Sequence, residues 1–183
     1  MKVVPTSIAD VLILEPVVFE DHRGYFMEIY QRERYAGLGI DVDFVQDNLS
    51  VSSKGTIRGL HFQHPHGQAK LVQVLHGEVF DVAVDVRRGS PTFGGWAGVV
   101  LSCTNHRQLF IPQGFAHGFC VISDKAVFHY KCGDFYTPSA ERGIIWNDSD
   151  LKIDWPQEAP VISEKDAMYG RLEDMPADFL PVY

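Results

Sequence analysis

The sequence has little cysteine: only Cys103, Cys120 and Cys132 occur among its 183 residues. An odd number of thiols without metal-type spacing does not form the paired disulfide framework of a small secreted domain. The N-terminal residues 1–16 also lack the uninterrupted apolar core and small-residue cleavage site of a signal peptide, because Pro5 and Asp10 break their apolar run. We therefore expect three reduced thiols and a cytoplasmic protein.

Long apolar runs and an excess of cations are missing as well. No segment approaches the roughly 20 apolar residues that cross a bilayer, so we expect no membrane association. Sixteen Lys and Arg stand against 24 Asp and Glu, which gives a formal net charge of -8 and argues against nucleic-acid binding. A local cationic cluster can still bind a small anion. With no repeat or boundary in the chain, we predict one domain over residues 1–183.

Short strand patterns are abundant. Residues 71–86 predict two strands around a turn at His76 and Gly77, and apolar side chains alternate with Asp81, Ala83 and Asp85 in the second strand. Four more patterns follow a Gly- and Pro-rich connection, at residues 96–102, 107–112, 118–123 and 126–132. This density favours a mainly β fold, an antiparallel barrel or sandwich.

Helical signals are weak and short. Residues 30–38 predict a brief helix that Gly39 stops, and Ser163 followed by Asp166 gives a loose N-cap pattern for residues 163–169. The C-terminal segment is rich in Pro with interspersed apolar positions. We expect it to pack back onto the barrel.

Histidines and cations gather in residues 58–70. The P-x-G-x-x-H pattern ending at His117 resembles the cupin family of small β-barrels, whose metal-binding members follow an H-x-H with Glu. Here His64 and His66 supply the H-x-H, but Lys70 stands at the Glu position. An ammonium repels a divalent cation and cannot ligate while protonated. We therefore predict no metal and place His64 and His66 at the surface, with His22 and His106.

The same residues suit removal of a proton next to a ketone. His61 is a candidate base near neutral pH, and Lys70 or Tyr130 could stabilise the enolate that forms. Tyr130 could also return a proton from the opposite face. Either Asp166 or Asp81 could hold the tautomer of the histidine, and spacing alone does not choose between them. Taken singly, each of these side chains also has an ordinary structural explanation.

Together these stretches resemble the dTDP-4-dehydrorhamnose 3,5-epimerase family of cupins, in the family's order and over nearly the whole chain. The matching segments are residues 21–28, 44–50, 57–63, 68–79, 85–96, 108–119, 130–138, 141–156 and 163–166. A string of this length is far more specific than any one motif.

The resemblance implies a cupin-type jelly-roll antiparallel β-barrel with a few short helices, acting as a homodimer without metal or cofactor. The implied substrate is a dTDP-linked 4-keto-6-deoxyhexose, dTDP-4-dehydro-6-deoxy-D-glucose. Inversion at C3 and C5, both next to the C4 ketone, would give dTDP-4-dehydro-L-rhamnose for dTDP-L-rhamnose biosynthesis and so for carbohydrate such as the lipopolysaccharide O-antigen.

By the same resemblance, the base falls on His61, its carboxylate partner on Asp166, the opposite-face acid on Tyr130 and the enolate-stabilising lysine on Lys70. The implied contacts to the substrate, beside Lys70, are Arg23, Glu28, Gln46, Asn48, Arg58, His117, Glu141 and Lys165.

The sequence departs from the family pattern at two places, Phe135 where Tyr is common and Gly170 where Pro is frequent. These departures leave open an enzyme that inverts C3 alone, or a related keto-deoxysugar isomerase on the same fold. The sequence also leaves open a metal cupin, such as an iron or manganese dioxygenase or isomerase, and a sugar-binding or regulatory cupin without catalysis.

One geometric conflict arises within residues 57–63. In a regular strand Arg58 and His61 point to opposite faces, because side chains alternate. Both can reach one substrate only if the strand is irregular. We therefore predict such an irregularity, either a bend or bulge at Gly59 or a strand that ends before one of the two residues.

Overall fold

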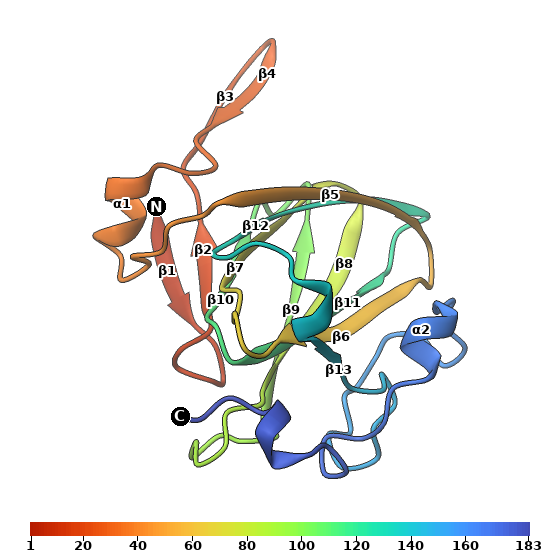
Figure 1. Cartoon of the computed structure of the whole chain (residues 1–183). Helices are drawn as coiled ribbons and strands as arrows, with labels where there is room; N and C mark the ends of the chain where they lie inside the picture. The colour runs from red at the N-terminus through yellow and green to blue at the C-terminus, as the bar shows by residue number, and fades with distance from the viewer.

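The computed structural model describes all 183 residues as two antiparallel sheets that face each other, with a two-stranded hairpin beside them (Figure 1). The larger sheet has the order β1-β2-β10-β7-β12-β5, and the smaller sheet has the order β13-β6-β11-β8-β9. This mainly antiparallel architecture with few short helices confirms the predicted fold class. The two sheets are not joined by hydrogen bonds into a closed barrel.

The bounds of the elements follow the chain. The larger sheet contains β1 (Lys2–Pro5), β2 (Leu12–Glu15), β5 (Gln46–Ser53), β7 (Lys70–His76), β10 (Gln108–Ile111) and β12 (Lys125–Cys132). The smaller sheet contains β6 (Ile57–Gln63), β8 (Glu78–Asp85), β9 (Trp96–Ser102), β11 (Phe115–Val121) and β13 (Glu141–Gly143). The remaining elements are β3 (Val18–Asp21), β4 (Gly24–Met27), α1 (Arg32–Ala36), α2 (Glu164–Ala167) and the 3₁₀ turns η1 (Pro138–Ala140) and η2 (Ala177–Phe179).

The predicted elements are confirmed with small shifts at their ends. The two strands expected in residues 71–86 are β7 and β8, and the turn between them contains Gly77 in the left-handed region. Both helices lie within the predicted ranges. Ser163 caps α2 by accepting a hydrogen bond from the Asp166 amide, as the N-cap pattern indicated.

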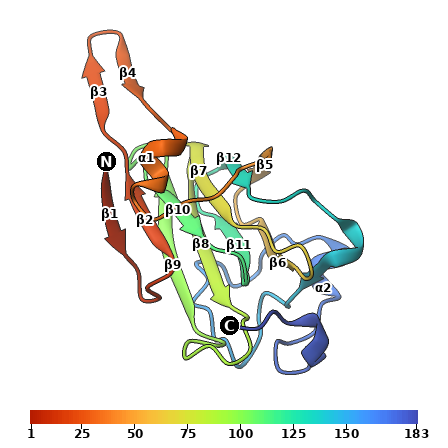
Figure 2. The same cartoon turned by 60° about the vertical axis from the view of Figure 1, so that its left-hand side comes forward.

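The main core lies between the two sheets. It contains 16 buried apolar residues, among them Val72 and Phe128 from the larger sheet and Val79 and Phe119 from the smaller sheet. A second cluster packs C-terminal residues such as Leu172 against the outer face of the smaller sheet. Figure 2 shows the backbone of the C-terminal segment, in blue, beside this sheet. The expectation that the C-terminal segment packs back on the fold is thus confirmed.

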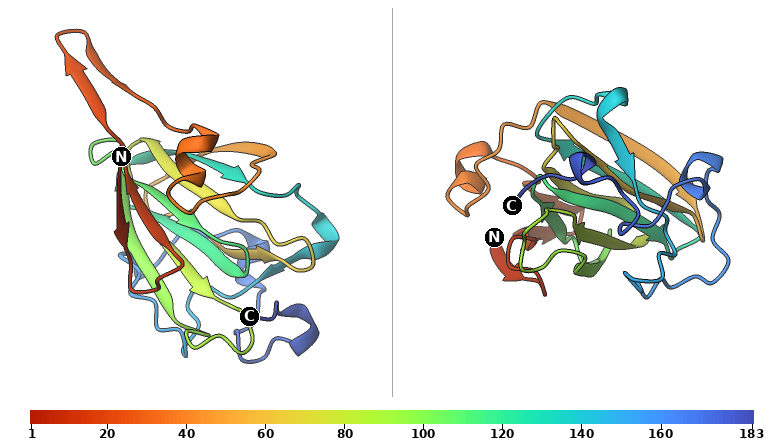
Figure 3. Two further views of the ribbon diagram at one scale, coloured as in Figure 1. Left: turned by 90° about the vertical axis from the view of Figure 1, so that its left-hand side faces the viewer. Right: turned by 60° about the horizontal axis from the view of Figure 1, so that its bottom comes forward.

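The β3–β4 hairpin stands clear of both sheets (Figure 3). Its Phe19, Tyr25 and Phe26 side chains are all more than half exposed. Exposed aromatic side chains on a protruding element indicate a surface for contact with another molecule. No helix in the structure is long and apolar enough to cross a membrane.

The predicted irregularity at Gly59 is a β-bulge. His61 pairs with His117 and Arg58 pairs with Phe119, so β6 uses three residue steps where β11 uses two. The extra residue turns Arg58 to the same face as His61. Gly59 adopts φ +120, and a Cβ there would lie 2.5 Å from the Gly118 Cα atom and 2.6 Å from the His117 carbonyl oxygen. Only glycine fits this backbone and this contact.

We predict that Gly59→Ala lowers the free energy of unfolding by about 3 kcal/mol or more, because the added Cβ strains φ and overlaps β11. Chemical denaturation measures this change. Gly24→Ala is the matched control, since Gly24 also has a positive φ but no atom within 4 Å of an added Cβ. Equal losses for the two variants would contradict the steric part of this explanation.

Candidate active site

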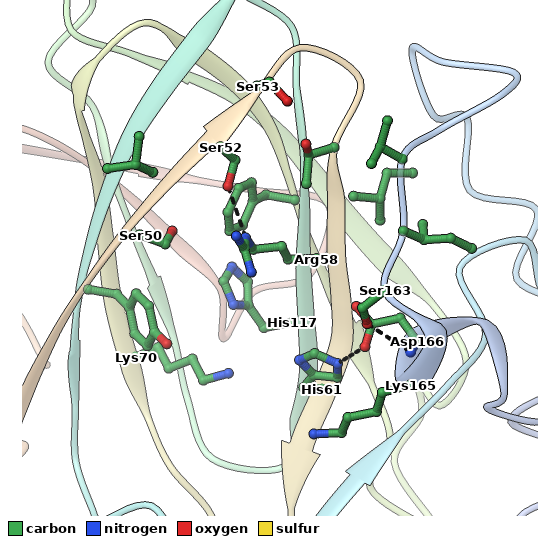
Figure 4. A pocket seen from close by; sticks show the side chains of 17 residues that line it. Ser50, Ser52, Ser53, Arg58, His61, Lys70, His117, Ser163, Lys165 and Asp166 are labelled. Atoms are coloured by element: carbon green, nitrogen blue, oxygen red, sulfur yellow. Dashed lines mark hydrogen bonds and ion pairs between the residues drawn. The ribbon is translucent and has the colours of Figure 1, made fainter.

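A cavity of about 640 Å³ opens between the two sheets, beyond the end of the apolar core (Figure 4). Side chains alternate between the two faces of each strand, and this alternation directs polar side chains into the cavity. On β7, Val72 and Val74 face the core and Lys70 faces the cavity, and on β12, Phe128 faces the core and Tyr130 faces the cavity. The same inner faces are therefore apolar along one part and polar along the other.

His61 and Asp166 form a hydrogen-bonded dyad at the cavity wall. His61 Nε2 lies 2.7 Å from Asp166 Oδ1, and Asp166 is buried at the start of α2. Burial alone would raise the pKa of Asp166, but the hydrogen bond and charge of His61 hold it below its usual value. An ionised carboxylate only accepts hydrogen bonds, so in the neutral imidazole Nε2 carries the hydrogen and Nδ1 has the free lone pair.

A second dyad lies deeper, between His117 on β11 and Asp81 on β8. His117 Nε2 is 3.0 Å from both carboxylate oxygens of Asp81, which has no exposed surface. Burial lowers the pKa of His117, although Asp81 opposes this shift. The structure thus settles the choice left open by spacing: Asp166 is the partner of His61, and Asp81 is the partner of His117.

Lys70 and Tyr130 face His61 from the opposite sheet. Lys70 is 9% exposed, and burial lowers the pKa of its ammonium, which Cys132, Asp81 and Glu141 only partly offset. No carboxylate forms an ion pair with it. Burial raises the pKa of the Tyr130 phenol, so this group keeps its proton near neutral pH. The cavity therefore has an acceptor on one wall and two donors on the other.

Arg58 and small hydroxyl side chains line the outer part of the cavity. The bulge directs Arg58 there, and its Nε donates to Ser52 Oγ at 2.9 Å. The Ser50 hydroxyl is buried and has no hydrogen-bond partner. A cation beside an unpaired hydroxyl indicates a place for an anionic or hydroxyl-bearing ligand.

A second cavity of about 270 Å³ adjoins the first, and Lys70, His61 and Tyr130 line both. At its rim, Glu141 Oε2 accepts from Lys165 Nζ and from the Tyr136 hydroxyl, each at 2.6 Å. Burial would raise the pKa of Glu141, but these two hydrogen bonds keep it below its usual value.

Gln46 and Asn48 of β5 also line this second cavity, and they hydrogen-bond to each other at 3.0 Å. The structure thus gathers ten of the twelve predicted residues around the two cavities. They are His61, Lys70, Tyr130, Asp166, Gln46, Asn48, Arg58, His117, Glu141 and Lys165.

Arg23 and Glu28 lie elsewhere. Arg23 is on the protruding hairpin and is paired with Asp21 at 2.6 Å, and Glu28 follows the hairpin and binds Arg34 at 2.8 Å. Neither residue lines a cavity that contains His61. The structure of one chain therefore does not bring them to the site.

Sequence reasoning missed several residues that line or support the site. Ser50 and Ser52 continue the alternation of Gln46 and Asn48 along β5, and this period of two could have found them. Tyr136 lies in the loop after β12, where no periodicity exists. Gln63 holds this loop, since its side chain donates to the Phe135 carbonyl and accepts from the Thr137 amide.

The predicted surface histidines line neither of the two cavities. His64 and His66 lie in the loop between β6 and β7, and His66 is 3.6 Å from Asp134. No group of three His, Cys, Asp or Glu side chains is arranged to hold a metal ion.

Known proteins resemble this chain along its whole length. Residues 5–174 match the family model described as dTDP-4-dehydrorhamnose 3,5-epimerase. The dTDP-4-dehydrorhamnose 3,5-epimerase of Pseudomonas aeruginosa is 57% identical, covering 99% of this chain and 100% of that protein. The enzyme of the same name from Shigella flexneri is 56% identical over 91% of this chain and 93% of its own length.

Solved structures are similar to this chain as well. A dTDP-6-deoxy-D-glucose-3,5-epimerase from Legionella pneumophila, crystallised in complex with dTDP-4-keto-L-rhamnose, has a TM-score of 0.97 and 52% identity. The match covers 100% of this chain and 98% of that one. A dTDP-4-dehydrorhamnose 3-epimerase from Streptomyces niveus is 41% identical over 100% of this chain and 90% of its own length.

We predict that Lys70→Met raises the free energy of unfolding by about 1 kcal/mol or more, because it removes a buried cation that has no ion-pair partner. Denaturation at neutral pH measures this, with the exposed Lys125→Met as control. A loss of stability in Lys70→Met would contradict the conclusion that Lys70 is held at a cost to the fold.

Proposed function

The chain belongs to the dTDP-4-dehydrorhamnose 3,5-epimerase family, and we propose that it inverts C3 and C5 of dTDP-4-dehydro-6-deoxy-D-glucose to give dTDP-4-dehydro-L-rhamnose. This isomerase reaction is a step of dTDP-L-rhamnose biosynthesis. One observation carries the assignment of residues: the His61–Asp166 dyad faces Tyr130 and the unpaired cation of Lys70 across a single cavity.

His61 is the proposed base. Both C3 and C5 lie next to the C4 ketone, which acidifies their hydrogens, and a neutral imidazole is suited to remove them. Asp166 keeps the hydrogen on Nε2, so that Nδ1 accepts the proton from carbon. The carboxylate then stabilises the imidazolium that results.

Lys70 and Tyr130 complete the acid–base set. When the proton leaves, negative charge moves to the C4 oxygen, and the Lys70 ammonium supplies the matching positive charge inside a site of low dielectric. Tyr130 lies on the sheet opposite His61 and keeps its phenol proton. It donates this proton to C5 from the other face, which inverts the centre. The ketone and Lys70 together make the step feasible without a cofactor.

The nucleotide lies along the outer part of the cavities. Arg58 supplies forked hydrogen-bond donors to the diphosphate, and Lys165 adds a second cation that is also paired with Glu141. Local cations of this kind let a chain of net charge -8 bind an anion. Beside them, polar contacts to the substrate come from Gln46, Asn48, His117 and Glu141.

Arg23 and Glu28 serve a partner subunit in this proposal. They lie on or beside the exposed hairpin and outside the cavities of their own chain. In a homodimer, the hairpin of one subunit can extend to the nucleotide in the other. The exposed aromatic side chains of the hairpin support such a contact.

We predict that His61→Ala lowers kcat by about 10²–10⁴-fold, because the base is lost, while dTDP affinity changes little. Product formation by NMR and dTDP titration by calorimetry separate the two effects. His76→Ala is the control, since His76 is exposed at the end of β7 and lines neither cavity. Near-normal turnover in His61→Ala would refute the assignment.

Subunit mixing tests the role of the hairpin. We predict that Arg23→Ala raises KM with little change in kcat, and that His61→Ala is inactive. Mixed dimers of the two variants then recover one site with wild-type KM, because the intact hairpin of one subunit meets the intact base of the other. If the mixed dimers show only the raised KM of the Arg23→Ala homodimer, the hairpin does not contribute to the site of the partner subunit, and the proposed role of Arg23 is refuted.

A further inference from the structure

Gly143 lies directly beside His61, and the ring of Tyr169 occupies the space that a side chain at position 143 would take. Gly143 pairs with His61 in the antiparallel register of β13 and β6. A Cβ atom added to Gly143 would overlap three carbons of the Tyr169 ring. The ring centroids of Tyr169 and His61 are 5.7 Å apart, with an interplanar angle of 68°. The two aromatic rings thus pack edge to face.

One short segment therefore contacts the imidazole at two places. Asp166 accepts its hydrogen bond, and Tyr169, three residues later, packs against its ring. The segment itself is fixed, because the Ile145 amide donates to the Gly170 carbonyl at 2.9 Å. This hydrogen bond ties the position of Tyr169 to the backbone that follows β13.

Tyr169 does not line either cavity that contains His61. Its side chain is half-buried and borders a separate shallow pocket together with Glu141 and Arg142. It is thus in contact with the proposed base but not with the space where the substrate binds. Tyr169 therefore borders two of the proposed substrate-binding residues, Glu141 and Lys165, from outside the two cavities.

We propose that Tyr169 is a positioning residue that holds the His61 ring in the orientation needed for proton abstraction. The hydrogen bond to Asp166 fixes one nitrogen but leaves the ring free to tilt about that contact. Packing of Tyr169 over Gly143 removes this freedom and excludes water from the same side. The inference rests on the proposed role of His61 as base. A misplacement of about 1 Å at a reacting group can cost about 10²-fold in rate.

The first test compares Tyr169→Ala with Tyr169→Phe. We expect Tyr169→Ala to lower kcat about tenfold with KM within about twofold of wild type, because alignment is lost and substrate contacts remain. Tyr169→Phe keeps the ring and should retain most of the activity. Met168→Ala is the matched control, since Met168 is the preceding residue and is 79% exposed.

A spectroscopic readout accompanies the rates. The proton shared by His61 and Asp166 should give a downfield ¹H NMR resonance in the ligand-free wild type and in Tyr169→Phe, and this resonance should broaden in Tyr169→Ala. It is independent of turnover. An inactive wild type would therefore refute the proposed function, whereas an active wild type with the same resonance in Tyr169→Ala would refute the positioning role.

Gly143→Ala provides the second variant. Gly143 has no positive φ, and the three atoms nearest to the added methyl group all belong to the Tyr169 ring. We expect Gly143→Ala to lower kcat in the wild-type background and to have little further effect in Tyr169→Ala. If the losses of kcat caused by Gly143→Ala and Tyr169→Ala add in the double variant, the proposal is wrong. It is also wrong if Tyr169→Ala keeps the wild-type kcat or if Tyr169→Phe impairs kcat as much as Tyr169→Ala does. A loss of kcat that is explained by unfolding of the variant would overturn it too.

Discussion

The active-site geometry depends on the single extra residue that β6 inserts at Gly59. Without it, Arg58 and His61 would point to opposite faces of the smaller sheet. The bulge brings both into one cavity, and it also places the Gly59 amide 3.4 Å from Asp166 Oδ2, next to the dyad. The same close approach of β6 to Gly118 that requires glycine thus sets where the Arg58 cation and the proposed base His61 meet.

The second constraint is the burial of charge inside a β core. Two buried carboxylates are hydrogen-bonded to histidines, Asp166 to His61 and Asp81 to His117. Lys70 is buried without such a partner. A fold optimised for stability alone would not keep an unpaired cation there, because desolvation disfavours it. In the proposed reaction the negatively charged enolate oxygen is the partner of the Lys70 ammonium. The unfavourable burial of Lys70 is then explained by its role in stabilising that charge.

Much of this could be predicted from the sequence, and the reasons differ by region. Alternation with a period of two predicts the strands and the polar inner face around Lys70 and Tyr130. The bulge was predictable from a conflict between that alternation and the need for Arg58 and His61 in one site. Spacing could not choose between Asp166 and Asp81, because Asp166 is 105 residues from His61 along the chain and the fold brings them together; the family resemblance alone indicated Asp166. Tyr136 and Tyr169 lie in loops, where no periodic signal exists.

Exchange with solvent tests the central claim most directly, since removal and return of a proton at carbon must carry label into the product. The wild-type protein is incubated with dTDP-4-dehydro-6-deoxy-D-glucose in deuterated water containing a chelator, and the product is followed by ¹H NMR. We predict deuterium at both C3 and C5 and formation of dTDP-4-dehydro-L-rhamnose at a rate that the chelator does not change. Label at C3 alone, or turnover that stops when metal is removed, would contradict the proposed reaction.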